Sequence, residues 1–119
     1  MGAMPQEVAL VKASMKISKV ETIGGREFVS GNLHGFETVL VFSRWGKVAS
    51  ASTATTLFNV YGVDFLLFTG VAGAVDPILN IGDVVVGSKF YQHDMDARPI
   101  FPKFHIPLTD TMTFSPADT

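Results

Sequence analysis

Residues 68–76 read FTGVAGAVD and decide the fold, because an apolar run leads straight into a glycine loop. The run is residues 64–68 (DFLLF), short and apolar like strands that are buried on both faces. Residues 47–61 before it have helical spacing, and Gly62 is a natural helix stop. A helix, a buried strand and a glycine loop in this order predict an α/β fold. In such folds ligands bind at the carboxyl ends of strands, which is where residues 68–76 lie.

The chain upstream of this stretch predicts a helix followed by an antiparallel meander. Pro5 suits a first helical turn, and apolar residues at spacings of three and four predict a helix over residues 5–14. Alternation with one slip in period predicts a strand over residues 16–23. Further strands are expected over two segments, 27–30 and 36–42. The residues GNLHG at 31–35 are expected to form the turn between them.

Two further expectations concern the second helix and the end of the chain. One face of the helix at 47–61 is expected to consist of Val48, Ala51, Thr55 and Phe58, with Ala54, Leu57 and Tyr61 beside them. A turn at 80–82 precedes residues 83–86 (DVVV), which predict a second buried strand. Residues 92–107 contain three prolines and are expected to form loops.

The composition narrows the classes of function. The 119 residues are enough for about one domain, and with 47% hydrophobic and 17% charged residues they can build a core. The net charge is −2 and no stripe of basic residues is present, so nucleic acid is not an expected partner. No apolar run approaches the roughly 20 residues of a membrane span. The lack of cysteine excludes disulfides and thiolate metal sites, and it fits the cytoplasm, where we expect the protein to act.

Several polar residues are candidates for chemistry, each with a plainer alternative. Glu7 falls in the first turn of the first helix, where the helix dipole favours a carboxylate, but ordinary helix starts have glutamates too. The glycine loop 70–73 matches neither a P-loop nor a G-x-G-x-x-G motif. It allows either close backbone approach to a ligand or a tight turn. Trp45 is either a pocket wall or a core plug.

Residues 93–96 (HDMD) raise the question of a metal site. No further histidine, cysteine or glutamate stands at ligand spacing, so a hydrogen-bonded loop start is favoured over metal binding. His34 lies in a turn and His105 among prolines, and neither has a nucleophile near it in sequence. We expect no metal and no cofactor.

Four segments in their order and spacing resemble the bacterial 5′-methylthioadenosine/S-adenosylhomocysteine nucleosidases, which belong to the purine nucleoside phosphorylase superfamily. The segments are GAMPQEV at 2–8, SRWGKVASASTATTL at 43–57, FTGVAGA at 68–74 and NIGDVVVGSKFYQHDMDA at 80–97. The resemblance runs along the whole chain but covers only the amino-terminal half of the family's enzymes. It implies hydrolysis of the N-glycosidic bond of an adenine thionucleoside, which releases adenine and a thioribose through an oxocarbenium-like transition state.

The resemblance assigns roles to individual residues. Glu7 matches the carboxylate that positions and deprotonates the attacking water, a role that suits a general base. The positions that match the substrate-binding segments are Ala3, Met4, Trp45, Val71, Ala72 and Gly73. The loop that closes the pocket of a neighbouring subunit matches the segment around Phe101, Phe104 and Pro107.

The glycine loop also bears on the nucleophile. Phosphorylases of the superfamily hold phosphate with an arginine two residues before the first loop glycine and a serine just after it. Phe68 and Val71 occupy these places, and neither side chain can bind an anion. The resemblance therefore implies water as the nucleophile, with a nucleoside phosphorylase as the alternative.

The implied fold is a three-layer α/β/α fold with a mixed central sheet, of which residues 1–119 are the amino-terminal part. We expect the first strand and the carboxy-terminal half to be missing, together with the family's ribose-binding glutamate and adenine-protonating aspartate. The implied partners are a nucleoside substrate and a second subunit in a homodimer. A second chain that carries the other half, and a non-catalytic nucleoside-binding or interaction fragment, stay open as alternatives.

Overall fold

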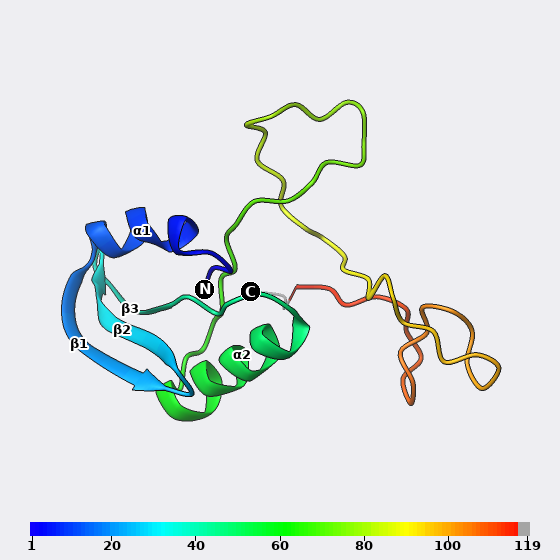
Figure 1. The fold of residues 1–119 in the computed structure, drawn as a ribbon, viewed down its shortest axis with the longest axis horizontal. Coiled ribbons are helices and arrows are strands. Elements are labelled where there is room, and N and C mark those ends of the chain that lie inside the picture. Colours follow the sequence, from blue (N-terminus) through cyan, green and yellow to red (C-terminus); the bar gives the residue numbers. More distant parts are fainter. Residues whose placement is uncertain (117–119) are drawn as a thin grey trace. The chain divides into compact units, whose positions relative to one another are not determined.

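The computed structural model describes residues 1–116, and the chain divides into a unit of residues 1–73 and a unit that begins at residue 74. The helices and strands of the described residues all lie in the first unit (Figure 1). In chain order they are α1 (Pro5–Ser14), β1 (Lys16–Ile23), β2 (Arg26–Leu33), β3 (Phe36–Val41) and α2 (Lys47–Tyr61). Both predicted helices are confirmed, and Gly62 ends α2 in the left-handed conformation with φ 61°.

The three strands form an antiparallel sheet in the order β1-β2-β3, which confirms the predicted meander. The slip in the period of β1 is a register shift between Ile17 and Lys19. The predicted strand at 27–30 was too short, because β2 continues to Leu33. His34 and Gly35, with φ of 52° and 99°, form the turn alone. Two successive positive φ angles match the twist of a two-residue hairpin, so pairing extends up to the turn.

The helices α1 and α2 cover opposite faces of this sheet (Figure 1). Adjacent residues of a strand point to opposite faces, and Val29 pairs with Leu40 while Phe28 pairs with Val41. The first pair packs against α1 and Met15. The second pair packs against Leu57 of α2. Hence the sheet is already a middle layer between helices.

The buried face of α2 differs from the predicted one. Thr53 and Leu57 are buried, whereas Val48 is 85% and Phe58 46% exposed. Apolar and small residues occur almost all round this helix, so its periodicity does not fix which side meets the sheet. The Phe28 and Tyr61 rings stack with centroids 5.0 Å apart, and this contact helps to set the orientation of α2.

Two short segments, residues 1–2 and residues 67–69, extend the sheet beyond β3. Gly2 lies parallel to Phe42, with its N–H donating to the Val41 carbonyl at 3.2 Å. On the other side, the amino group of Met1 donates to the Leu67 carbonyl at 2.8 Å, and the Thr69 N–H donates to the Met1 carbonyl at 3.1 Å. This pattern is that of a parallel ladder, so residues 1–2 lie between β3 and residues 67–69.

The predicted strands at 64–68 and 83–86 were wrong in the described residues. The first segment makes only the short ladder with Met1, and Phe65 and Leu67 are 57% and 63% exposed. The second is a loop in which Val84 and Val86 are 92% and 88% exposed. A strand has no internal hydrogen bonds and needs neighbours. Within the described residues, segment 64–68 meets one only at Met1, and segment 83–86 meets none.

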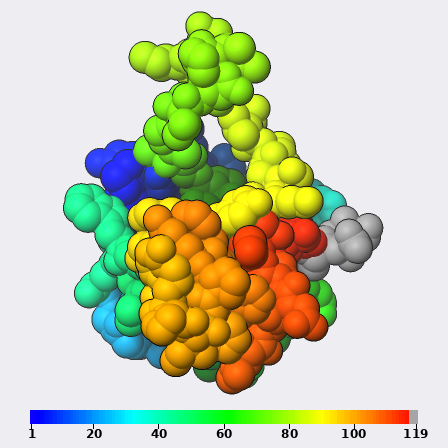
Figure 2. Space-filling view, turned by 90° about the vertical axis from the view of Figure 1, so that its right-hand side faces the viewer, coloured from blue at the N-terminus to red at the C-terminus, as the bar shows by residue number. Residues whose placement is uncertain are grey.

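The second unit consists of loops. The predicted turn at 80–82 is confirmed, because the Asp83 N–H donates to the Asn80 carbonyl at 3.1 Å and Gly82 has φ 100°. Phe90 and Phe114 form an isolated antiparallel bridge. In the space-filling view the orange and red segments of this unit pack against each other, and the yellow-green segment before them forms an open loop (Figure 2). Within residues 1–116 no helix is long and apolar enough to cross a membrane.

Candidate active site

Glu7 lies where the start of α1 meets two backbone amides. Pro5 begins the helix, and Met4 before it is extended. The N–H groups at this end of the helix have no acceptor within the helix, and Glu7 at the third helical position lies beside those of Ala3 and Met4. The Glu7 carboxylate takes them: its Oε2 accepts the Ala3 N–H at 2.7 Å and the Met4 N–H at 2.8 Å. A glutamate that accepts from the helix cap forms half of a capping box.

A third donor reaches Glu7 from the glycine loop. The Val71 N–H donates to Oε1 at 3.0 Å, across 64 positions of sequence. The ladder between Met1 and residues 67–69 explains this approach, because it carries the chain directly into Gly70 and Val71 beside the start of α1. Glu7 is thus more than an ordinary helix-start residue, since it joins the helix to a distant loop.

These contacts lower the pKa of Glu7 below its ordinary value. The hydrogen bond from Val71 contributes most, those from Met4 and Ala3 add to it, and partial desolvation opposes them. Hydrogen bonds to the charged form favour ionisation, and the positive end of a helix acts in the same direction. Near neutral pH the carboxylate is therefore ionised. Oε1 accepts one bond among those described, which leaves it able to accept another from a water molecule.

The structure brings together some of the predicted site residues and leaves others apart. Ala3, Met4 and Val71 surround Glu7 through their backbone amides. Gly73 follows in the same loop, with open space where a side chain would stand. Trp45 follows β3 and is 75% exposed, so it does not plug the core of the described residues.

Gly2 and Gly70 are residues of this site that the sequence prediction did not assign. Both lie in the segments that carry the family resemblance, and both approach the Glu7 side chain closely. In the sequence, a glycine indicates that another group can approach the backbone closely, but it does not identify that group as the Glu7 side chain.

The three residues predicted to close a neighbouring pocket belong to the second unit. The Phe101 ring stacks on His105 with centroids 5.5 Å apart, and the Lys103 ammonium lies 4.9 Å from the Phe104 ring centroid. Just before Pro107, the Ile106 N–H donates to the Thr111 carbonyl at 3.0 Å. The Nδ1 atom of His105 is buried and has no hydrogen-bond partner within the described residues.

Residues 93–96 form a hydrogen-bonded loop. The Asp96 carboxylate accepts from the Arg98 guanidinium, with Nε 2.8 Å from Oδ1, and these bonds lower the pKa of Asp96 to about 2. The Met95 N–H donates to the Gln92 carbonyl at 3.0 Å and closes the turn. Within residues 1–116 no three histidine, aspartate or glutamate side chains are grouped so as to hold a metal ion.

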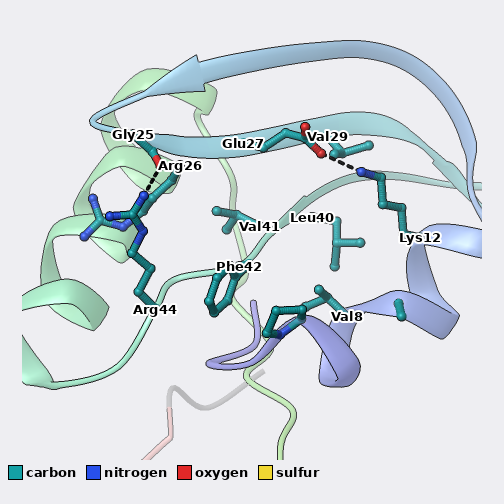
Figure 3. A pocket seen from close by; sticks show the side chains of 12 residues that line it. Val8, Lys12, Gly25, Arg26, Glu27, Val29, Leu40, Val41, Phe42 and Arg44 are labelled. Atoms are coloured by element: carbon teal, nitrogen blue, oxygen red, sulfur yellow. Dashed lines mark hydrogen bonds and ion pairs between the residues drawn. The ribbon is translucent and has the colours of Figure 1, made fainter.

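A groove of about 420 Å³ lies between α1 and the sheet (Figure 3), and Glu7 is not part of its lining. Arg26 and Arg44 lie on one side of it, and the ion pair between Lys12 and Glu27 lies on the other (Figure 3). The Arg44 guanidinium donates to the Gly25 carbonyl at 2.6 Å. The apolar part of the lining includes Val8 from α1 and four residues from the sheet and its end: Val29, Leu40, Val41 and Phe42. None of the predicted site residues lines this groove.

The order of elements, a helix, a three-stranded sheet and a second helix that leads to a glycine loop, defines an α/β protein. The sequence model described as the phosphorylase superfamily matches residues 1–119, and the chain belongs to that superfamily.

Known proteins that resemble the chain agree with this membership. It is 42% identical to the 5'-methylthioadenosine/S-adenosylhomocysteine nucleosidase of Shewanella loihica over 95 residues, which are 80% of this chain and 41% of that protein. The corresponding nucleosidase of Bacillus subtilis is 39% identical over the same coverage. The chain thus spans less than half the length of these relatives, and it matches their amino-terminal half.

Solved structures resemble the chain at similar coverage. The nucleosidase of Colwellia psychrerythraea 34H in complex with adenine has a TM-score of 0.92 and 36% identity, over 98% of this chain and 48% of that one. The futalosine hydrolase of Helicobacter pylori has a TM-score of 0.88 and 31% identity, over 96% of this chain and 49% of that one. Both likenesses cover about half of the solved protein.

Proposed function

We propose that residues 1–119 are the amino-terminal part of a single nucleosidase domain. The complete domain hydrolyses the N-glycosidic bond of 5′-methylthioadenosine and S-adenosylhomocysteine and releases adenine and a thioribose. The observation that carries this proposal is the Glu7 carboxylate, held by three backbone N–H groups from two distant segments. The names of the relatives at 39% and 42% identity supply the substrate class.

In this proposal Glu7 is the general base. A water molecule donates a hydrogen bond to the carboxylate, and its oxygen attacks the anomeric carbon of the ribose. The water proton passes to Glu7 while the bond between carbon and the purine nitrogen breaks. The bonding electron pair leaves with the adenine, which takes up a proton from an acid in the part of the domain outside residues 1–119. The fixed orientation of the carboxylate aligns the water with the reacting carbon, and positioned general bases accelerate reactions by about a hundredfold to ten-thousandfold.

The loop favours water over phosphate as the nucleophile. Phe68 and Val71 provide no anion-binding side chains. In addition, the Val71 N–H, a backbone group that could meet an anion, already donates to Glu7. A phosphate at this place would lose that donor and would be repelled by the ionised carboxylate. Phosphorolysis is therefore the weaker alternative.

The remaining site residues receive substrate roles in the same proposal. Trp45, exposed beside the end of β3, contacts the substrate, and Ala72 and Gly73 line the ribose and base. Ala3 and Met4 lie beside the sugar. In a homodimer, the segment around three second-unit residues closes the pocket of the partner subunit: Phe101, Phe104 and Pro107.

The complete fold in this proposal is a three-layer α/β/α sandwich with a mixed sheet, in a cytoplasmic enzyme. The helices on opposite faces of the sheet support the layers. The parallel ladder of residues 1–2 with Phe42 and Leu67, next to the antiparallel meander, supports the mixed sheet. The apolar segments 64–68 and 83–86 become central strands when the rest of the domain covers them.

A second candidate is hydrolysis of futalosine. The likeness to the Helicobacter pylori futalosine hydrolase supports it, with a TM-score of 0.88 and 31% identity. The proposed role of Glu7 is the same for both substrates, because each reaction would add water to a glycosidic carbon. The two candidates differ in the substrate group that the rest of the pocket accepts.

A chimera tests the proposal. In the chimera, residues 1–119 are followed by the part of the Colwellia psychrerythraea nucleosidase that this chain does not match. We call this chimera the completed chain. It is assayed with 5′-methylthioadenosine, S-adenosylhomocysteine and futalosine, each with and without phosphate. We expect adenine release from the first two without phosphate. Formation of a sugar 1-phosphate would contradict the proposal, and activity on futalosine alone would favour the second candidate.

A further inference from the structure

Gly70 has no room for a side chain, because the Glu7 carboxylate fills the space. A Cβ atom built on Gly70 would lie 2.7 Å from Oε1, 2.9 Å from Cδ and 3.1 Å from Oε2 of Glu7. All three distances are shorter than ordinary van der Waals contact, so an alanine here would push the carboxylate away. The backbone of Gly70 does not adopt a positive φ, so the requirement for glycine is one of space and not of conformation.

Gly2 faces the same side chain from the other strand of the ladder. Its Cβ atom would lie 3.2 Å from the Glu7 Cβ, 3.4 Å from Oε2 and 2.8 Å from a methyl group of Val8. Gly2 is also held by its own ladder bonds to Val41 and Ser43. The carboxylate of Glu7 therefore lies in a slot between two glycines of neighbouring backbone segments.

We propose that Gly70 is a positioning residue for Glu7, because its missing side chain leaves the slot in which the carboxylate meets the Val71 N–H. Gly2 forms the other wall of this slot. The inference rests on the proposed function for its catalytic meaning, but the slot itself is a property of the chain. Gly70 does not touch the reacting atoms and acts only through Glu7.

The consequence of filling the slot has a definite sign. In Gly70→Ala the carboxylate moves away from Val71, whose hydrogen bond is the largest cause of the lowered pKa of Glu7. The pKa of Glu7 should then rise towards its ordinary value. In the completed chain, a general base displaced by about 1 Å loses on the order of a hundredfold in kcat, with little change in KM.

The test measures the pKa of Glu7 without any substrate. The completed chain is labelled with ¹³C at glutamate side chains, and the Glu7 carboxyl signal, assigned by its loss in Glu7→Gln, is followed by NMR as a function of pH. Gly70→Ala is compared with Gly73→Ala, a matched change in the same loop whose Cβ would meet nothing within 4 Å. We expect the Glu7 pKa to rise in Gly70→Ala and to stay at its original value in Gly73→Ala. An equal pKa in both variants would overturn the inference.

A second comparison covers the case in which Gly70→Ala fails to fold. The same substitution is made in Glu7→Ala, where the carboxylate that it would strike is absent. Gly70→Ala should then cause much less loss of thermal stability than in the completed chain that keeps Glu7. An equal loss in both backgrounds would show that Gly70 serves the backbone and not Glu7. If these results hold but the completed chain hydrolyses no nucleoside, the slot stands and the proposed function fails.

Discussion

The apolar segments 64–68 and 83–86 lead to a prediction about completeness. Six of their side chains are 52% to 92% exposed, namely Phe65, Leu67, Phe68, Val84, Val85 and Val86. Full burial of such a side chain stabilises a fold by about 1.5–3 kcal/mol, so this exposure leaves about 1–2 kcal/mol unrealised for each. For all six the total is roughly 8 kcal/mol, which is as large as the net stability of about 5–15 kcal/mol of a typical domain.

The experiment compares residues 1–119 alone with the completed chain, in which the added part of the domain covers segments 64–68 and 83–86. We expect the 119-residue chain to unfold in a broad, weakly cooperative transition by circular dichroism and to bind the dye ANS. The completed chain should unfold cooperatively and bind little dye, because its apolar strands are covered. Size-exclusion chromatography at several concentrations shows whether the short chain covers its segments by self-association.

A single result would refute this reasoning. If residues 1–119 alone were monomeric, unfolded cooperatively and hydrolysed 5′-methylthioadenosine, they would be a whole domain and not part of one. The exposed segments would then be functional surfaces and not strands that lack neighbours.

Further predictions concern single residues, and the substitutions are made in the completed chain. Glu7→Gln keeps the shape and loses the base, so turnover should fall about a hundredfold to ten-thousandfold; near-normal turnover would return Glu7 to a purely structural role. The pKa of Glu7 is lowered in the folded chain, so its stabilising effect is present above the unfolded pKa and is lost as pH falls through the lower folded pKa. Because the ionised carboxylate is the proposed base, the acid limb of the pH profile of kcat/KM should lie below the ordinary glutamate pKa. Leu57→Ala should lower the unfolding free energy by about 2–5 kcal/mol, against less than about 0.5 kcal/mol for Leu10→Ala at a position that is 81% exposed; similar losses would contradict the packing of α2. Asp96 should titrate near 2 and not near 3.8 in an NMR titration, and Arg98→Ala should restore the higher value.

The features that sequence predicted well are encoded by neighbouring residues. Proline at the first turn, apolar spacing and a stop glycine fixed the bounds of both helices. The slip in the alternation of β1 indicated an irregularity, which the structure shows as a register shift between Ile17 and Lys19. Each of these signals is complete within about one turn or one strand, so it needs no knowledge of the rest of the fold.

The features that sequence missed depend on contacts between distant residues. The apolar run at 64–68 has the composition of a buried strand, but pairing requires neighbours that composition cannot supply. Residues of α2 are apolar on several sides, and the stacking of Phe28 on Tyr61 helps to select the buried one. The contact between Glu7 and Gly70 joins segments 63 positions apart, so neither segment alone could reveal it.

The place of residues 1–2 between β3 and residues 67–69 has a consequence for the order of folding. The hairpins of the meander close short loops, which takes about 1–10 μs. The bond between Met1 and Leu67 closes a loop of 66 residues, and every doubling of loop length adds about 0.6 kcal/mol of entropic cost. The meander should therefore form first and the surroundings of Glu7 last. Substitutions at Gly2 or Gly70 should then speed unfolding and leave the folding rate nearly unchanged.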